Sequence, residues 1–112
     1  LYPVYDLDVR FNVRVGAGSE LPDDLEEPYR GMATKLSQKR IDAVCVVDGE
    51  TWIVELTPRI GSRTLGQLMV YSKLLREQEQ LQGTIRLLAV GRSLAPDLAE
   101  SLAAQNIVVV LV

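Results

Sequence analysis

The sequence predicts an α/β domain in which a mixed β-sheet is sandwiched by helices. Strand-like and helix-like segments follow one another in the order β-α-β-β-α-β-α-β. The central hairpin is apolar on both of its faces, which is typical of strands that are covered on both sides. The last β-α-β stretch suits a right-handed crossover between parallel strands.

The N-terminal part predicts a strand and then a helix. Residues 4–15 alternate between apolar and polar side chains, which is the period of a half-exposed strand. Gly16 ends this strand, and residues 21–37 predict a helix in two pieces around Pro28. Four acidic residues lie near its start, where they would stabilise the positive end of the helix dipole. These are Asp23, Asp24, Glu26 and Glu27.

The centre of the sequence predicts a β-hairpin. Residues 41–47 form its first strand, Asp48-Gly49 is a strong signal for a two-residue turn, and residues 51–57 return. Pro58 and Gly61 end the second strand.

A long helix follows the hairpin. It begins at a cap formed by Ser62 or Thr64 and reaches about Gln80, before Gly83. The remaining elements are a strand at 85–90, a helix at 96–105 and a final strand at 107–112.

Composition restricts the chemistry. The 112 residues predict one domain over 1–112, and the net charge of −3 gives no general attraction to nucleic acid or membranes. No apolar run approaches a membrane span, and no secretory signal is evident, so we expect a cytoplasmic protein. The sequence has no histidine, and its single cysteine, Cys45, cannot form an intramolecular disulfide. Hydrolytic chemistry must therefore use carboxylates, hydroxyls, lysine or arginine.

The hairpin register brings two acids together. A turn at Asp48-Gly49 places Asp42 directly opposite Glu55, with Cβ atoms roughly 4.5–5.5 Å apart. Two carboxylates among apolar neighbours need a proton, a basic side chain or a divalent cation. Mg²⁺ is one solution, because it binds one or two carboxylates, water and phosphate. The alternative is an ion pair at the sheet edge with Lys39, Arg40 or Arg59.

These residues resemble the PD-(D/E)XK nuclease superfamily, whose fold is called restriction-endonuclease-like. Asp42 follows Arg40-Ile41 on one strand, and Glu55 lies on the next, as in the superfamily signature. Gln67 and Tyr71 on the following helix are similar to the Gln-x-x-x-Tyr motif of its exonuclease-like branch. The resemblance implies a DNA phosphodiesterase that works as a homodimer with Mg²⁺ or Mn²⁺. The implied metal ligands are Asp42, Glu55 and the carbonyl of Leu56, and the implied catalytic positions are Asp42, Glu55, Thr57, Gln67 and Tyr71.

One position departs from that signature. Thr57 stands where the family has a lysine, so the positive charge has to come from another residue, such as Arg59, Lys35, Lys39 or Lys73. We expect Arg59, Arg63 and Lys73 to contact DNA phosphates. Because the lysine is missing, a non-catalytic binding or assembly protein with a nuclease fold, for instance of a phage or mobile element, is the second hypothesis. A plain α/β interaction module with an ion pair at the sheet edge is the third.

Overall fold

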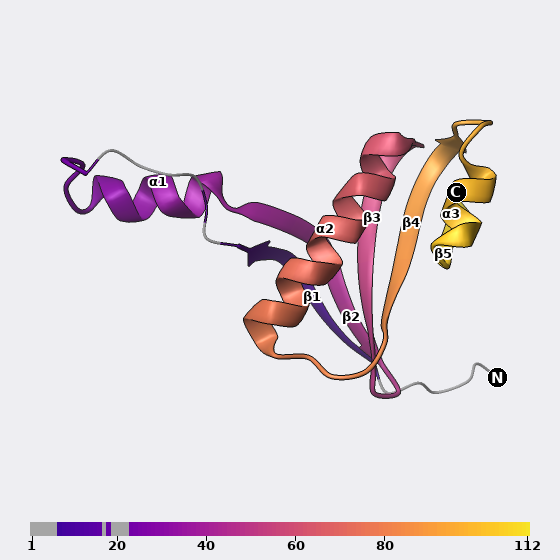
Figure 1. The fold of residues 1–112 in the computed structure, drawn as a ribbon, viewed down its shortest axis with the longest axis horizontal. Coiled ribbons are helices and arrows are strands. Elements are labelled where there is room, and N and C mark those ends of the chain that lie inside the picture. Colours follow the sequence, from indigo (N-terminus) through magenta and orange to yellow (C-terminus); the bar gives the residue numbers. More distant parts are fainter. Residues whose placement is uncertain (1–6, 17, 19–22) are drawn as a thin grey trace.

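The computed structural model describes residues 7–16, 18 and 23–112, apart from the side chains of residues 35–37. A single sheet contains five strands in the order β1-β2-β3-β4-β5. The predicted order of strands and helices is confirmed (Figure 1). The strands are β1 (Leu7–Val15), β2 (Lys39–Val47), β3 (Glu50–Ile60), β4 (Ile85–Leu94) and β5 (Ile107–Leu111), and the helices are α1 (Tyr29–Ser37), α2 (Ser62–Glu79) and α3 (Ala99–Ala104).

The sheet is mixed because its two halves are connected differently. β1, β2 and β3 are antiparallel, whereas β3, β4 and β5 are parallel and joined by helices. Asp48 and Gly49 both have positive φ, at 49° and 83°, which an Asp-Gly hairpin turn of the primed type requires. The turn fixes the ladder from Val47↔Glu50 to Ala43↔Val54, and this confirms the predicted register.

The described helices α2 and α3 cover one face of the sheet. Both parallel connections step in the same direction across the sheet, so right-handed crossovers place both helices on the same side. Their apolar side chains pack against inward residues of the parallel strands. This core includes Ile53, Leu68, Leu75, Leu87, Ala89, Leu102 and Ile107.

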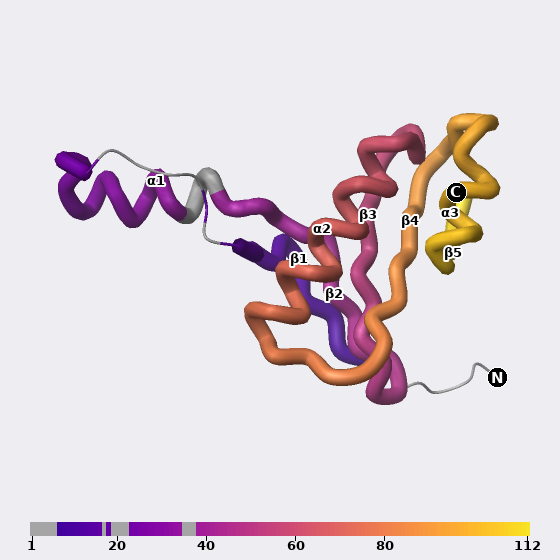
Figure 2. Tube along the Cα trace, in the orientation of Figure 1, coloured from indigo at the N-terminus to yellow at the C-terminus, as the bar shows by residue number. Residues whose placement is uncertain are grey.

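The opposite face of the sheet is open within the described residues, although we expected helices on both faces. Phe11 on β1 is 70% exposed, and Val110 on β5 is 41% exposed. The helix that could have covered this face is α1, but it projects beyond the ends of β1 and β2 (Figures 1 and 2). The apolar alternation of the strands therefore predicted the sheet correctly but not the number of covered faces.

The first helix is shorter than predicted. α1 begins at Tyr29, and the described residues before it, from 23 to 28, form turns and irregular backbone. A proline disfavours helical backbone in the residue before it, so the helix begins only after Pro28. The acidic residues from Asp23 to Glu27 thus precede the helix and do not lie within its first turn. Glu27 still stabilises that turn as expected, because its Oε2 accepts a hydrogen bond from the N–H of Gly31 at 3.2 Å. Residues 21 and 22 lie outside the described residues.

β3 is longer than predicted, because it continues through Pro58 to Ile60. The ladder with β2 ends at Val54, so Pro58, which has no N–H to donate, lies where β3 has no partner on that side. On its other side β3 stays paired with β4, through Thr57↔Gly91 and Arg59↔Ser93. The parallel pairing therefore carries β3 to the start of α2.

The ends of α2 differ slightly from the prediction. Gly61 is the N-cap, and its N–H donates to Oγ1 of Thr64 at 3.1 Å. At the other end, Gln80 takes the left-handed conformation that terminates many helices, before Gly83 is reached. No helix in the described part of the chain is both long and apolar enough to cross a membrane.

Candidate active site

Asp42 and Glu55 meet where the β2–β3 ladder ends. The last paired residues are Ala43 and Val54, and beyond them the acids replace the ladder with side-chain hydrogen bonds. The N–H of Asp42 donates to Oε1 of Glu55 at 3.3 Å. The N–H of Leu56 donates to Oδ2 of Asp42 at 2.8 Å. Each carboxylate is therefore positioned by backbone of the neighbouring strand.

Glu55 lies in an environment that disfavours its charge. Its side chain faces α2, and the residue is only 6% exposed. Burial, the negative charge of Asp42 and a hydrogen bond between the two side chains raise the pKa of Glu55 to about 7, although the Asp42 N–H opposes this rise. Without a cation Glu55 is therefore partly protonated near neutral pH.

Arginines surround the acids without neutralising them. Arg40, Arg59 and Arg63 all line the same cavity as the acids. The ion pairs found in the described part of the chain lie elsewhere, between Arg10 and Glu79 at 2.8 Å and between Arg86 and Glu50 at 3.5 Å. The predicted alternative, an ion pair of the acids with Lys39, Arg40 or Arg59, is thus absent among the described residues.

The cavity over the acids has a volume of about 350 Å³ and opens between the sheet and the start of α2. Gln67 and Tyr71 line it from α2, one helical turn apart. Burial and the charges of Glu55 and Asp42 raise the pKa of Tyr71, while the positive charge of Arg63 and a hydrogen bond with Gln67 oppose the rise. Tyr71 therefore remains a neutral phenol beside the carboxylates.

Thr57 also lines this cavity, at the position where the nuclease signature that the sequence resembles has a lysine. Its hydroxyl donates to the carbonyl oxygen of Arg59 at 3.2 Å. The hydroxyl proton is thus engaged by the backbone two residues further along the chain, and Thr57 adds no positive charge to the site. The nearest candidates for that charge are the three arginines of the cavity.

For two basic residues, the position relative to the cavity differs from what the sequence suggested. Lys73 is exposed and does not line the cavity, because it lies two residues beyond Tyr71 and points to another side of α2. Arg40, in contrast, was considered only as an ion-pair partner of the acids, yet it lines the cavity. Strand alternation could have identified it, since residues 40 and 42 point to the same face. The side chain of Lys35 lies outside the described residues.

The donor set suits a small, hard divalent cation. Two carboxylates converge, and backbone carbonyls and water can complete the shell that Mg²⁺ prefers. No group of three or more His, Cys, Asp or Glu side chains forms a metal cluster within the described residues. The pair therefore fits Mg²⁺ or Mn²⁺, which accept carboxylate, carbonyl and water oxygens, better than it fits zinc.

The arrangement of strands and helices has a counterpart among solved structures. A repair endonuclease from Pyrococcus abyssi has a similar fold. The TM-score is 0.56 at 21% sequence identity, and the match covers 65% of this chain and 32% of that one. The likeness supports the mixed α/β fold expected from the sequence, and the matched region spans about a third of the endonuclease. No protein-family model matches the chain, and no curated protein matches it.

Proposed function

We propose that the chain is a metal-dependent DNA phosphodiesterase domain of the PD-(D/E)XK type. The observation that carries this proposal is the state of Glu55, a buried carboxylate beside Asp42 that no described basic side chain neutralises. Burying such a pair is costly unless a proton or a cation compensates for the charge. A divalent cation bound by both acids would supply that compensation at neutral and alkaline pH.

In this proposal each group around the cavity has a distinct role. Asp42, Glu55 and the carbonyl of Leu56 hold Mg²⁺ or Mn²⁺. When bound, the ion orients water and stabilises negative charge on the phosphate. Arg59 and Arg63 bind the phosphate from the rim.

Gln67 and Tyr71 position the substrate or its attacking water with neutral hydrogen-bonding groups. Arg40, on the strand that carries Asp42, is a further phosphate contact. The solved neighbour is described as a repair endonuclease, and this description supports DNA as the substrate.

A second candidate function is a non-catalytic DNA-binding domain, and Thr57 is the observation that favours it. A neutral hydroxyl that donates to Arg59 cannot replace a lysine ammonium next to the attacking water. The arginines could still bind phosphate, so binding would survive without cleavage. The two candidates differ only in whether the bound phosphodiester is cut.

Plasmid nicking tests the proposal. Wild type, Glu55→Gln and Glu50→Gln are compared with Mn²⁺ or Mg²⁺, and with EDTA. Glu50 is the matched control, since it lies on the same strand, is exposed and pairs with Arg86 away from the cavity. We expect metal-dependent nicking by wild type and Glu50→Gln but not by Glu55→Gln.

Thr57→Lys separates the two candidates. Nicking by this variant but not by wild type would support the non-catalytic domain, because it would show an intact metal site that lacks only the lysine. Nicking by wild type that Glu55→Gln retains would refute the proposed site.

We also propose that the domain forms a homodimer through the open sheet face. Five strands at ~4.8 Å spacing and about six residues of ~3.3 Å give a patch of roughly 500 Å² in projection. Side chains that stand out from this plane make the accessible area larger than the projection, toward the roughly 800 Å² per partner of standard interfaces. Phe11, Leu56 and Val110 lie on this face, opposite the acids. Sedimentation velocity should show a dimer for wild type and a monomer for Val110→Lys; a monomeric wild type would refute this assembly.

A further inference from the structure

A second groove lies next to the acid cavity along α2. Its volume is about 380 Å³, and it shares three residues with the cavity, Arg63, Gln67 and Tyr71. These residues follow one another at helical spacing, so the two hollows run into each other along one side of the helix. A ligand bound at the acids can therefore extend into the second groove.

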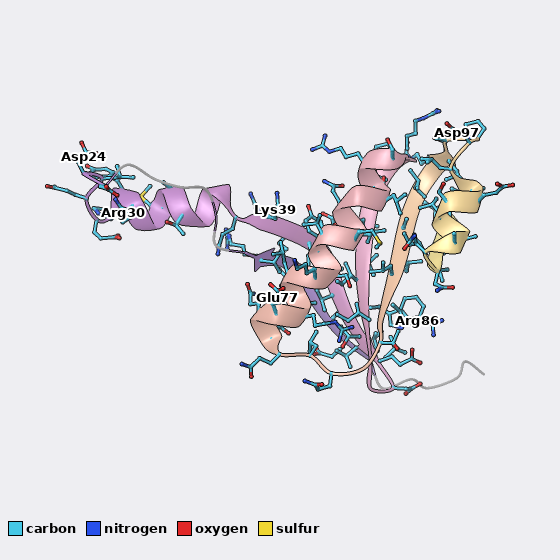
Figure 3. The ribbon with its side chains drawn as sticks, in the orientation of Figure 1. Asp24, Arg30, Lys39, Glu77, Arg86 and Asp97 are labelled. Atoms are coloured by element: carbon cyan, nitrogen blue, oxygen red, sulfur yellow. The ribbon has the colours of Figure 1, made fainter. Side chains whose placement is uncertain are left out.

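The second groove differs from the first in charge. Among the described residues, Lys39 and Arg63 line it and no carboxylate does. Figure 3 shows Lys39 near the start of β2, between α1 and α2. Val70, which is 45% exposed, adds an apolar surface on α2. Positive charge at the edge and apolar surface inside match a nucleotide, which has a phosphate at one end and a flat base at the other.

Gly66 provides an independent indication that something enters this groove. It lies inside α2, where glycine is less favourable than alanine. A Cβ at this position would meet no atom of the described residues within 4 Å, so packing against that part of the chain does not require glycine. The missing side chain instead leaves the groove open beside the helix backbone, as expected where a ligand approaches closely.

We propose that this groove binds the base and sugar of the nucleotide that adjoins the phosphate held at Asp42 and Glu55. The inference rests on the proposed function, because it takes the acid cavity as the phosphate site. It adds a contact to the base itself, made by Val70 and by the backbone at Gly66. Lys39, which lines only the second groove, holds the next phosphate along the same strand.

The test fills the groove and compares two probes. The variants are Gly66→Phe, which places a ring in the groove, and Met69→Phe, which places the same ring on an exposed side of α2 that lines neither hollow. The probes are a fluorescent oligothymidylate and an oligonucleotide of equal length with abasic residues. Binding is measured by anisotropy with Ca²⁺ on ice, and a gel confirms that both probes stay intact.

We expect wild type and Met69→Phe to bind oligothymidylate at least tenfold more tightly than the abasic probe. Gly66→Phe should lose this preference while its circular dichroism spectrum remains that of wild type. Equal preference in the two variants, or no preference in wild type, would overturn the inference.

The rise in melting temperature on adding Mn²⁺ distinguishes a failure of the groove assignment from a failure of the proposed function. The shift depends on the acids alone, so Gly66→Phe should keep it. If wild type shows the shift but no base preference, only the groove assignment fails. If wild type shows no shift, the metal site fails as well.

Discussion

The backbone N–H of Asp42 donates to Oε1 of Glu55 at 3.3 Å, so the hairpin holds two mutually repelling acids against each other. A hydrogen bond between the side chains accompanies this contact and raises the pKa of Glu55 together with burial. A proton on Glu55 makes the pair tolerable, and in the proposed function a cation takes the place of that proton. The stability of the protein should report which of the two is bound.

The first prediction concerns pH in the absence of metal. The pKa of Glu55 is about 7 in the folded chain, against an ordinary value of 4.5, so the folded state binds this proton more tightly. Stability should therefore be highest below about pH 4.5 for this group, fall as the pH rises to about 7, and then level off. We expect the free energy of unfolding to fall by about 2 kcal/mol over this range, a value that already allows for solvent screening at the cavity mouth.

Urea unfolding with EDTA at pH 5 and pH 8 measures this loss. Glu55→Gln should largely remove the difference between the two pH values, because the amide does not titrate. Glu50→Gln should keep the difference, since Glu50 is exposed on the hairpin. An equally large loss in Glu55→Gln would show that another group titrates.

The second prediction concerns metal binding. Mn²⁺ or Mg²⁺ should raise the melting temperature at pH 8 and have little effect at pH 5.5, because Glu55, whose pKa is about 7, must lose its proton to bind the ion. At ten times the Kd, linkage gives about 1.4 kcal/mol, or roughly 5 °C for a domain of this size. Differential scanning fluorimetry measures the shift, which Asp42→Asn and Glu55→Gln should abolish. A shift of the same size in Glu55→Gln would exclude Glu55 as a ligand.

The third prediction compares two glycines. A Cβ on Gly91 would lie 2.5 Å from the carbonyl oxygen of Thr57 and 2.9 Å from Cγ1 of Ile60. Gly91→Ala should therefore push β3 and β4 apart and cost about 1–3 kcal/mol of unfolding free energy. Gly66→Ala has open space around its Cβ and should instead stabilise α2 by roughly 0.5–1 kcal/mol. Urea denaturation distinguishes the opposite signs, and a neutral Gly91→Ala would contradict this packing.

The fourth prediction assigns the phosphate contacts. Arg40→Ala and Arg63→Ala should each weaken DNA binding and lower the slope of log K against log salt by about 0.7–0.9, as expected for one lost phosphate contact. Lys73→Ala is the control on the same helix as Arg63, and it should leave the slope nearly unchanged, since Lys73 lies outside both grooves. Salt titrations with Ca²⁺ measure these slopes. A loss confined to Lys73→Ala would place the DNA on another side of α2.

The features that could be predicted from the sequence depend on residues that are close together along the chain. The Asp48-Gly49 turn sets the hairpin register, and the register alone places Asp42 opposite Glu55. In the same way, the four-residue spacing of Gln67 and Tyr71 places them on one side of a helix. These relationships involve residues close in sequence, and they hold wherever the hairpin and the helix form.

The tertiary structure decided the properties that depend on distant parts of the chain. Burial of Glu55 requires α2 to pack over β3, and its raised pKa follows from that burial. Arg40 lines the acid cavity and Lys73 does not, and both facts depend on how α2 lies on the sheet. The open sheet face arises because two successive crossovers place both helices on one side. The sequence by itself therefore determined which acids meet, because a tight turn is local. Only packing decided the raised pKa of Glu55, the basic neighbours of the pair and the face of the sheet that is left exposed.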